Sequence, residues 1–193
     1  MNRILIDLPE TIETERLILQ MPKAGFGKKL HEAILDGYED YIKWLNWPLD
    51  PPTLQECEEE CRKDHAEFIL RDPIRYLVIS KGTRYVIGKC SFPPLQASWL
   101  IPQFGIGYFI RKSERGNRYA TEAAHAMALL AFRELKARKI EIYCDAENIA
   151  SKKIPLKLGF KCEDIVKDSG SVQDSKLVGM QVYSIFSEEE LLK

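Results

Sequence analysis

The chain has 193 residues, of which 45% are hydrophobic and 30% are charged, and its formal net charge is −1. This composition is typical of a globular protein with one sizeable core, and it excludes a general electrostatic attraction to nucleic acid or to an anionic membrane. No run approaches the roughly 18 apolar residues of a membrane span, and the beginning of the chain lacks the zones of a signal peptide. We therefore expect one domain over residues 1–193, a cytoplasmic location, and a monomer or homodimer without nucleic-acid or membrane partners.

The first part of the chain predicts a strand followed by helices. TERLILQM, residues 14–21, places its leucines on one side with the period of a strand. A helical spacing of apolar residues follows over 25–45 and stops at a proline-rich stretch. Thr53 stands three residues before Glu56, the spacing of a capping box, and so predicts the start of a helix that runs to about Leu70.

The five cysteines of the chain show no paired spacing typical of a disulfide framework. We expect them to be reduced thiols. Cys57, Cys61 and His65 share one face of the predicted helix, which makes a metal site conceivable. The alternative, a partly buried helix face, is the one we expect, and we predict no metal.

The second part of the chain alternates strands and helices. Residues 75–92 are two apolar runs around a turn sequence, which predicts a hairpin, and 104–110 predicts a strand whose glycines indicate a bulge or a close backbone contact. Further expected elements are a helix with an apolar face from Ala120 to Leu135, a strand at 138–148, a helix at 148–158, and strands at 160–166 and 176–186. We therefore predict a mixed α/β (α+β) fold, with one mostly antiparallel sheet and helices on both faces.

A tight loop precedes the helix that follows strand 104–110. The first N–H groups of a helix lack helical partners and the helix dipole is positive there, which favours an anion such as a phosphate. Gly116 permits a positive φ or a close ligand, and cations surround it. These cations are Arg111, Lys112, Arg115 and Arg118. An ordinary loop with a solvated basic face is the alternative; nucleotide binding is a weaker one, because the P-loop and dinucleotide-binding patterns are absent.

Together the motifs resemble the GCN5-related N-acetyltransferase (GNAT) superfamily, and within it the branch of ribosomal-protein-alanine acetyltransferases. TERLILQM is similar to the opening strand of that branch, VIGKCSF to its hairpin, and IGYFIRKSERGNRYATEA to its coenzyme A motif. DAENIASKKIPLKLGFK is similar to the closing signature, from Asn-x-x-Ser to Leu-Gly-Phe. The resemblance covers nearly the whole chain and implies an acetyl-CoA site between strands 104–110 and 140–145.

The resemblance also implies which residues contact coenzyme A. The backbone of Phe109 and Ile110, at the bulge of the family, would meet the pantetheine arm, and the loop motif Arg/Gln-x-x-Gly-x-Gly/Ala would bind the pyrophosphate. The middle glycine of that motif is Arg118 here, which either crowds the loop or reaches a phosphate. The residues implied to bind the coenzyme are Phe109, Ile110, Arg111, Arg115, Gly116, Asn117, Arg118, Tyr119, Ala120, Thr121, Asn148 and Ser151.

The Asn-x-x-Ser signature implies two further roles. Asn148 would hold pantetheine or simply cap its helix, and Ser151 would protonate or hydrogen-bond the departing thiolate. Two groups of the family are missing from this chain. The general-acid tyrosine is replaced by Pro155, which leaves the carbonyl of Ser151 free. The acidic residue of the fourth strand is replaced by Gly105.

The acceptor side is less defined. Glu141 and Asp145 are the candidate bases, and an α-amine with a pKa of about 8 needs less help from a base than a lysine at about 10.4. Tyr38, Trp44 and Trp47 lie where the branch places its acceptor wall, although such aromatics also serve as core.

We expect an acetyl-CoA-dependent N-acetyltransferase that acts on a protein N-terminus or on a small amine. The alternative is a coenzyme A-binding sensor or scaffold without turnover.

Overall fold

The computed structural model describes residues 2–45, 47–93, 101–166, 172–173, 176–177 and 179–192. Its longer helices and strands follow the order expected from the sequence, but the helical stretch 25–45 forms two helices, and the stretches 104–110 and 176–186 each form two strands. The short strands Thr11–Glu13 and Val172–Gln173 were not expected. In chain order the elements are η1 Arg3–Leu5, β1 Thr11–Glu13, β2 Leu17–Gln20, α1 Gly27–Leu35, α2 Tyr38–Leu45, α3 Leu54–Leu70, β3 Ile74–Ser80, β4 Val86–Phe92, β5 Gln103–Gly105, β6 Gly107–Ile110, η2 Lys112–Glu114, α4 Tyr119–Arg133, β7 Lys139–Asp145, α5 Ile149–Lys157, β8 Lys161–Val166, β9 Val172–Gln173, β10 Lys176–Leu177, β11 Met180–Ile185 and η3 Glu188–Glu190.

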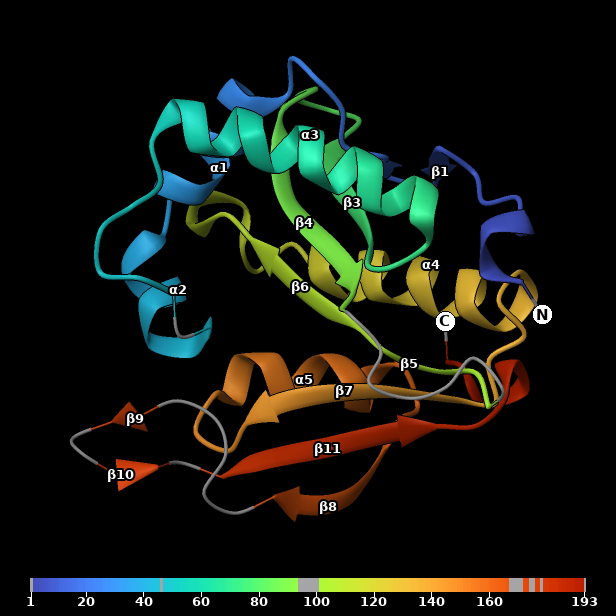
Figure 1. Ribbon diagram of the computed structural model, residues 1–193. Helices are drawn as coiled ribbons and strands as arrows, with labels where there is room; N and C mark the ends of the chain where they lie inside the picture. The colour runs from blue at the N-terminus through green and yellow to red at the C-terminus, as the bar shows by residue number, and fades with distance from the viewer. Residues whose placement is uncertain are drawn as a thin grey trace.

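The strands form two larger sheets, which separate between β5 and β6 (Figure 1). One sheet has the antiparallel order β1-β2-β3-β4-β6. The other has the order β5-β7-β11-β8, in which β5 and β7 are parallel and the remaining pairs antiparallel. The mixed, mostly antiparallel α/β fold expected from the sequence is confirmed. The expected continuous strand 104–110 is divided, because β5 pairs with β7 whereas β6 pairs with β4, and hydrogen bonding therefore separates the expected single sheet into two.

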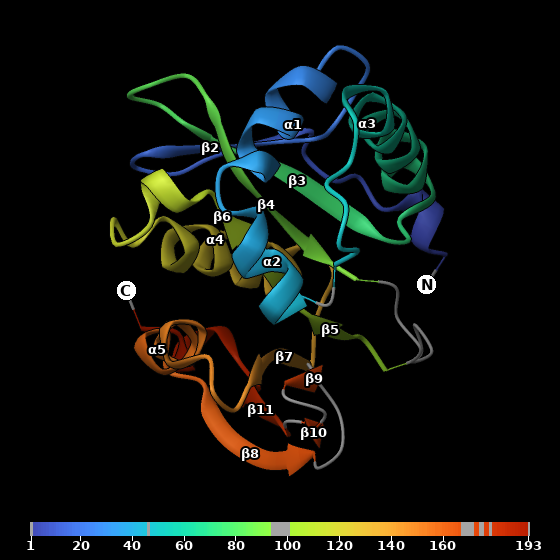
Figure 2. The same cartoon turned by 90° about the vertical axis from the view of Figure 1, so that its left-hand side faces the viewer.

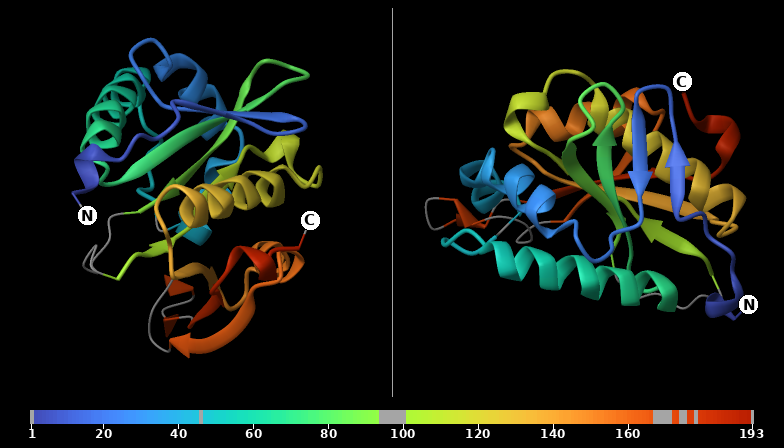
Figure 3. Two further views of the ribbon diagram at one scale, coloured as in Figure 1. Left: turned by 90° about the vertical axis from the view of Figure 1, so that its right-hand side faces the viewer. Right: turned by 90° about the horizontal axis from the view of Figure 1, so that it is seen from above.

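Helices cover both faces of the five-stranded sheet. α1 and α3 pack on one face and α4 packs on the other (Figure 3). α5 packs on β7 and beside α4. In the part of the chain that the structure describes, no helix has the length and apolar character needed to cross a membrane.

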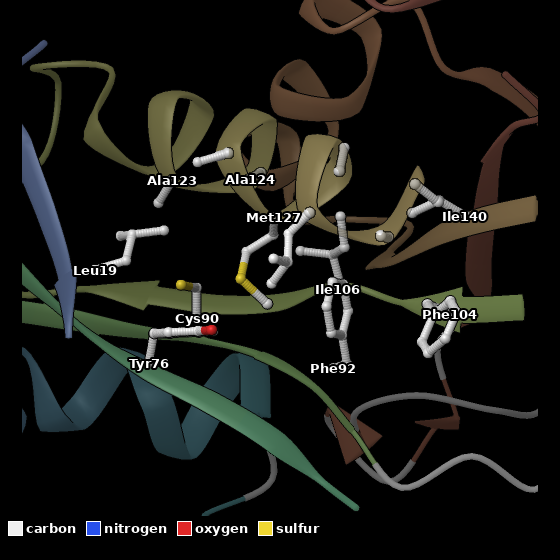
Figure 4. Packing of buried hydrophobic residues seen from close by; sticks show 14 of the residues in the cluster. Leu19, Tyr76, Cys90, Phe92, Phe104, Ile106, Ala123, Ala124, Met127 and Ile140 are labelled. Carbon is white, nitrogen blue, oxygen red and sulfur yellow. The ribbon is translucent and has the colours of Figure 1, made fainter. Parts of the chain in front are cut away.

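Small residues let α4 lie close to the sheets. Ala123, Ala124 and Met127 are fully buried, and the side chain of Met127 extends toward Cys90 of the first sheet (Figure 4). The same hydrophobic cluster reaches Ile140 on β7, so it joins the two sheets. Burial of a side chain such as Met127 stabilises the fold by roughly 1.5–3 kcal/mol. The apolar helix face expected from the sequence is therefore confirmed.

The predicted capping box begins α3. Thr53 accepts from the backbone of Glu56, and the side chain of Glu56 accepts in return from the backbone of Thr53. Cys57 and Cys61 lie on the buried face of this helix and are fully buried. Burial raises the pKa of the Cys57 thiol to about 11 and that of the Cys61 thiol to about 12. His65 contacts the carbonyl of a loop residue instead. The buried helix face is therefore confirmed, and the described residues contain no group of three His, Cys, Asp or Glu side chains that could hold a metal ion.

Candidate functional site

The backbones of β6 and β7 diverge at the end of the molecule that Figure 2 shows, where α2 also lies, and an opening lined by residues of these elements and of α5 is found there. At the base of this opening Ile106 N donates to Glu141 O over 2.8 Å. Two cavities of about 390 and 270 Å³ occupy it. The residues that line both are Trp44, Leu45, Tyr108, Asn148 and Ser151. The two cavities therefore meet between β6 and the N-terminus of α5.

The loop before α4 forms one wall of the larger cavity. Of the residues expected to bind the coenzyme, all except Arg111 and Asn117 line this cavity. The carbonyl oxygen of Asn117 instead accepts from the guanidinium of Arg16 at 3.0 Å, and its side chain donates to Glu114 O at 3.2 Å. Asn117 thus shapes the loop from its outer side.

Two residues of this loop have left-handed backbone conformations. Gly116 has φ 83°, and Arg118, the N-cap of α4, has φ 63°. A Cβ atom at Gly116 would meet nothing within 4 Å, so the backbone angle rather than space favours glycine there. Arg118 adopts a conformation that costs a side-chain-bearing residue about 1–2 kcal/mol. This explains in physical terms why a glycine would suit position 118.

The side chain of Arg118 has no hydrogen-bond or ion-pair partner among the residues that the structure describes. It also does not cap α4. Tyr119, Ala120 and Thr121, the first residues of α4, line the cavity with it. The N-terminus of α4 therefore presents its N–H groups and one exposed guanidinium to the same cavity.

Two other arginines near the loop have internal partners. Arg111 Nε donates to Asp36 Oδ2 at 2.7 Å, and Arg111 lies outside the cavity lining, contrary to the expected coenzyme contact. Arg115 forms an ion pair with Asp40, and its Nε donates to Ile110 O at 3.0 Å. Burial alone would raise the pKa of Asp36, but hydrogen bonds from Ser113 and Arg111 outweigh it, and the pKa lies below its ordinary value. These ion pairs fasten the loop to the segment of α1 and α2.

The backbone of β6 faces the opening through alternate residues. Ile106 N donates toward β7 whereas Arg111 N donates to β4, at Ile87 O. The backbone N–H and C=O groups of successive residues point to opposite sides of an antiparallel strand. The N–H and C=O groups of Tyr108 and Ile110 therefore face the opening, and those of Phe109 face β4. Of the two residues whose backbone was expected to meet pantetheine, only Ile110 is so directed, and Tyr108 joins it.

Side chains of three elements meet where α5 begins. Asn148 caps α5, and its Oδ1 accepts from Ser151 N at 3.0 Å, as expected. Ser151 Oγ lies 3.3 Å from the hydroxyl of Tyr108 and 3.3 Å from Cys144 Sγ. The sequence analysis did not identify Tyr108 as a site residue. The signal that could have found it is a tyrosine on the same strand face as Ile106 and Ile110, in the strand just before the loop.

The two candidate bases lie in different places. Glu141 pairs with Lys139 at 2.8 Å, accepts from Tyr143 at 2.9 Å and lines neither cavity. Asp145 is 4% exposed and lines the smaller cavity, where its Oδ1 also accepts from Glu147 N at 2.9 Å. The structure therefore brings Asp145, and not Glu141, to the smaller cavity.

The expected acceptor wall is also divided. Trp44 lines both cavities. The hydroxyl of Tyr38 donates to backbone carbonyls of the loop after α2, and the ring of Trp47 lies 5.1 Å from that of Tyr41 and 5.5 Å from that of Phe109. Tyr38 of α2 thus belongs to the buried core and Trp47 packs against it, whereas Trp44 is the member of the set that meets the opening.

Comparison with solved structures gives the fold. The chain superposes on the ribosomal L7/L12 α-N-protein acetyltransferase RimL in complex with coenzyme A with a TM-score of 0.83, at 18% identity, covering 93% of this chain and 99% of that one. It superposes on the microcin C7 self-immunity acetyltransferase MccE, in complex with acetyl-CoA and AMP, with a TM-score of 0.81, at 16% identity, covering 93% and 97%.

Sequence comparison gives the family. An uncharacterized N-acetyltransferase, p20 of Bacillus licheniformis, is 27% identical over 181 residues, which are 93% of this chain and 98% of that protein. The profile described as acetyltransferase (GNAT) domain matches residues 16–161, and the match includes the loop, β7 and the whole of α5. The chain therefore belongs to the GNAT acetyltransferase family.

Proposed function

We propose that this protein transfers an acetyl group from acetyl-CoA to a primary amine. The observation that carries the proposal is the junction at Ser151, where a cavity with an anion-binding loop meets a second cavity lined by a carboxylate. Membership of the GNAT family supports the donor and the reaction. We further propose that residues 1–193 form one N-acetyltransferase domain and act in the cytoplasm, where the five unpaired thiols would stay reduced.

The groups of the larger cavity fit the coenzyme. The uncapped N-terminus of α4 and the guanidinium of Arg118 suit phosphates, and Gly116 lets the loop backbone come close. The strand backbone of Tyr108 and Ile110 suits the amides of pantetheine. When bound, the coenzyme would supply the acetyl group as a thioester. The residues of this chain then bind, orient and exclude water around it.

Two side chains would move or hold protons during the transfer. The amine nitrogen bonds to the acetyl carbon, the carbon–sulfur bond breaks, and the nitrogen loses a proton. Asp145, at the smaller cavity, would accept that proton, directly or through water. Ser151, between the two cavities, would donate a hydrogen bond to the departing sulfur.

The acceptor is either a protein N-terminal α-amine or a small amine. One similar structure is named for α-N-acetylation of a ribosomal protein, which supports the first kind, and another is named for microcin C7 self-immunity. Trp44 at the wall of the smaller cavity would contact the part of the acceptor next to the amine. We propose a primary amine acceptor of one of these two kinds.

The direct test is thiol release from acetyl-CoA across a panel of amines and N-terminal peptides, with mass spectrometry of the products. An acceptor that raises thiol release and gains one acetyl group supports the proposal. Calorimetric binding of coenzyme A without acceptor-dependent release would instead support a sensor or scaffold. Thermal stabilisation by ATP as strong as that by coenzyme A would favour nucleotide binding.

A further inference from the structure

The hydroxyl of Tyr108 lies at the junction of the two cavities and has no role in the transfer as described above. It is 3.3 Å from Ser151 Oγ and 3.4 Å from Ser151 O. These contacts join β6 to the first turn of α5 across the opening. Tyr108 therefore contacts both the hydroxyl and the backbone of the residue proposed to meet the departing sulfur.

Pro155 explains why the carbonyl of Ser151 is available. In an α-helix this carbonyl would accept from the N–H of the residue four positions later. That residue is Pro155, inside α5, and proline has no N–H. The tyrosine hydroxyl lies 3.4 Å from the carbonyl that the proline leaves without its helical donor, within reach of donating to it. The proline and the tyrosine are thus complementary.

We propose that Tyr108 is a positioning residue that orients the hydroxyl of Ser151 toward the junction of the cavities; this inference rests on the proposed acetyl transfer. The Tyr108 oxygen restricts the rotation of the Ser151 side chain, because it lies within hydrogen-bonding distance of Ser151 Oγ. The tyrosine has one hydroxyl hydrogen, which it donates either to Ser151 O at 3.4 Å or to Ser151 Oγ at 3.3 Å. In the arrangement in which it donates to Ser151 Oγ, the serine hydrogen is left to donate to the sulfur. In this arrangement a neutral tyrosine, acting through the hydroxyl of Ser151, performs the role that a general-acid side chain in direct contact with the sulfur would otherwise have.

The surroundings keep Tyr108 in the protonated form that such a donor needs. Burial raises the pKa of its hydroxyl above the ordinary value of 10.0, and the nearby Cys144 adds to this effect. Tyr108 therefore stays a hydrogen-bond donor over the whole working range. Ionisation of Tyr108 should therefore cause no fall in kcat at any pH below about 10.

A double-mutant cycle tests whether Tyr108 acts through Ser151. Tyr108→Phe removes the hydroxyl and keeps the ring, and it should lower kcat about tenfold with little change in the KM for acetyl-CoA. In a Ser151→Ala background the same change should have almost no further effect. Tyr85→Phe, at an exposed tyrosine of the β3–β4 hairpin, is the matched control. Equal losses in both backgrounds would overturn the proposal.

Pro155→Ala distinguishes two possible roles of Tyr108: orienting the hydroxyl of Ser151, and donating a hydrogen bond to the carbonyl of Ser151. This change returns a backbone donor to Ser151 O. In the Tyr108→Phe protein it should leave kcat low, since the serine hydroxyl still lacks its partner. Full recovery of kcat would show that the tyrosine merely satisfies the carbonyl, and would overturn the proposal.

Crystal structures of the wild type and of Tyr108→Phe with coenzyme A give a readout that is independent of turnover. We expect Ser151 Oγ within hydrogen-bonding distance of the sulfur in the wild type and in another rotamer in the variant. One unchanged rotamer in both would overturn the inference. A wild type that binds coenzyme A but acetylates no amine would contradict the proposed function, and the two structures would still decide the role of Tyr108. Failure to bind coenzyme A would overturn both.

Discussion

Arg115 of the loop before α4 and Asp40 of α2 form an ion pair that fastens the two segments together. The same guanidinium donates to Ile110 O at 3.0 Å and lies 5.5 Å from the ring centroid of Tyr41. α2 carries Trp44, which lines both cavities. Arg115, which the sequence motif assigned to the coenzyme, therefore holds α2, and with it Trp44, in place beside the cavities.

Asp40→Asn should weaken binding of coenzyme A two- to threefold, because it loosens α2 against the loop. The ion pair is more than a third exposed on both sides, so the free energy of unfolding should fall by no more than about 1 kcal/mol. Calorimetry and denaturant unfolding measure the two effects, with Glu39→Gln, an exposed neighbour on α2, as control. Tighter binding in Asp40→Asn would contradict this account, since it would mean that the freed guanidinium binds phosphate.

Arg118→Gly should have opposite effects on stability and binding. Glycine removes the cost of the left-handed conformation, so the free energy of unfolding should rise by about 1 kcal/mol. Loss of the exposed guanidinium should weaken coenzyme A binding about tenfold or more if it meets a phosphate. Thermal unfolding and calorimetry measure the two quantities.

Arg118→Asn serves as the control, because asparagine tolerates the left-handed region but carries no charge. It should bind coenzyme A as weakly as Arg118→Gly. Comparison with 3′-dephospho-coenzyme A would show which phosphate is involved: a smaller difference between wild type and variant identifies the 3′-phosphate. Equal or better binding by Arg118→Gly would show that the arginine only crowds the loop.

Asp145→Asn should lower kcat/KM for the amine by about 10²–10⁴-fold while coenzyme A binding stays close to that of the wild type. The reason is that Asp145 is the candidate base that lines the smaller cavity. Glu141→Gln is the matched control, because Glu141 pairs with Lys139, accepts from Tyr143 and lines neither cavity. Steady-state kinetics with one amine measure both. A larger loss in Glu141→Gln than in Asp145→Asn would reverse the assignment.

Local signals carried the parts of the site that could be predicted. The helix start after the loop, the cap at Asn148 and the capping box at Thr53 each depend on a few neighbouring residues. The apolar face of α4 is likewise visible in its spacing, because one helix face repeats every three to four residues. These features were found where the sequence placed them.

Tertiary contacts decided the rest. The glycines on either side of Ile106 indicated a break in regular pairing, but the choice of β4 by one half and β7 by the other depends on distant strands. The partners of Arg111 and Arg115 are aspartates 75 residues earlier. Tyr108 gains its role only because α5 lies across the opening. No local pattern contains these pairings.

Glu122 gives a pH-dependent contribution to stability at the start of α4. It accepts from Thr14 Oγ1 at 2.6 Å and from the backbone and side chain of Arg16 at 2.8 and 2.7 Å. Burial alone would raise its pKa, but these hydrogen bonds outweigh it, so the pKa in the folded protein lies below its ordinary value of 4.5. The carboxylate therefore stabilises the fold above that value, and this stabilisation is lost as the pH falls through the folded pKa.

Glu122→Gln should lower the free energy of unfolding by about 1 kcal/mol at pH 7, since Arg16 is partly exposed and screened by solvent. The difference from the wild type should shrink as the pH falls below about 4.5, because both proteins then carry a neutral side chain at this position. Urea unfolding at several pH values measures it, with Glu134→Gln at the other end of α4 as control. A loss of the same size at pH 3 and pH 7 would show that shape, and not charge, makes the contribution.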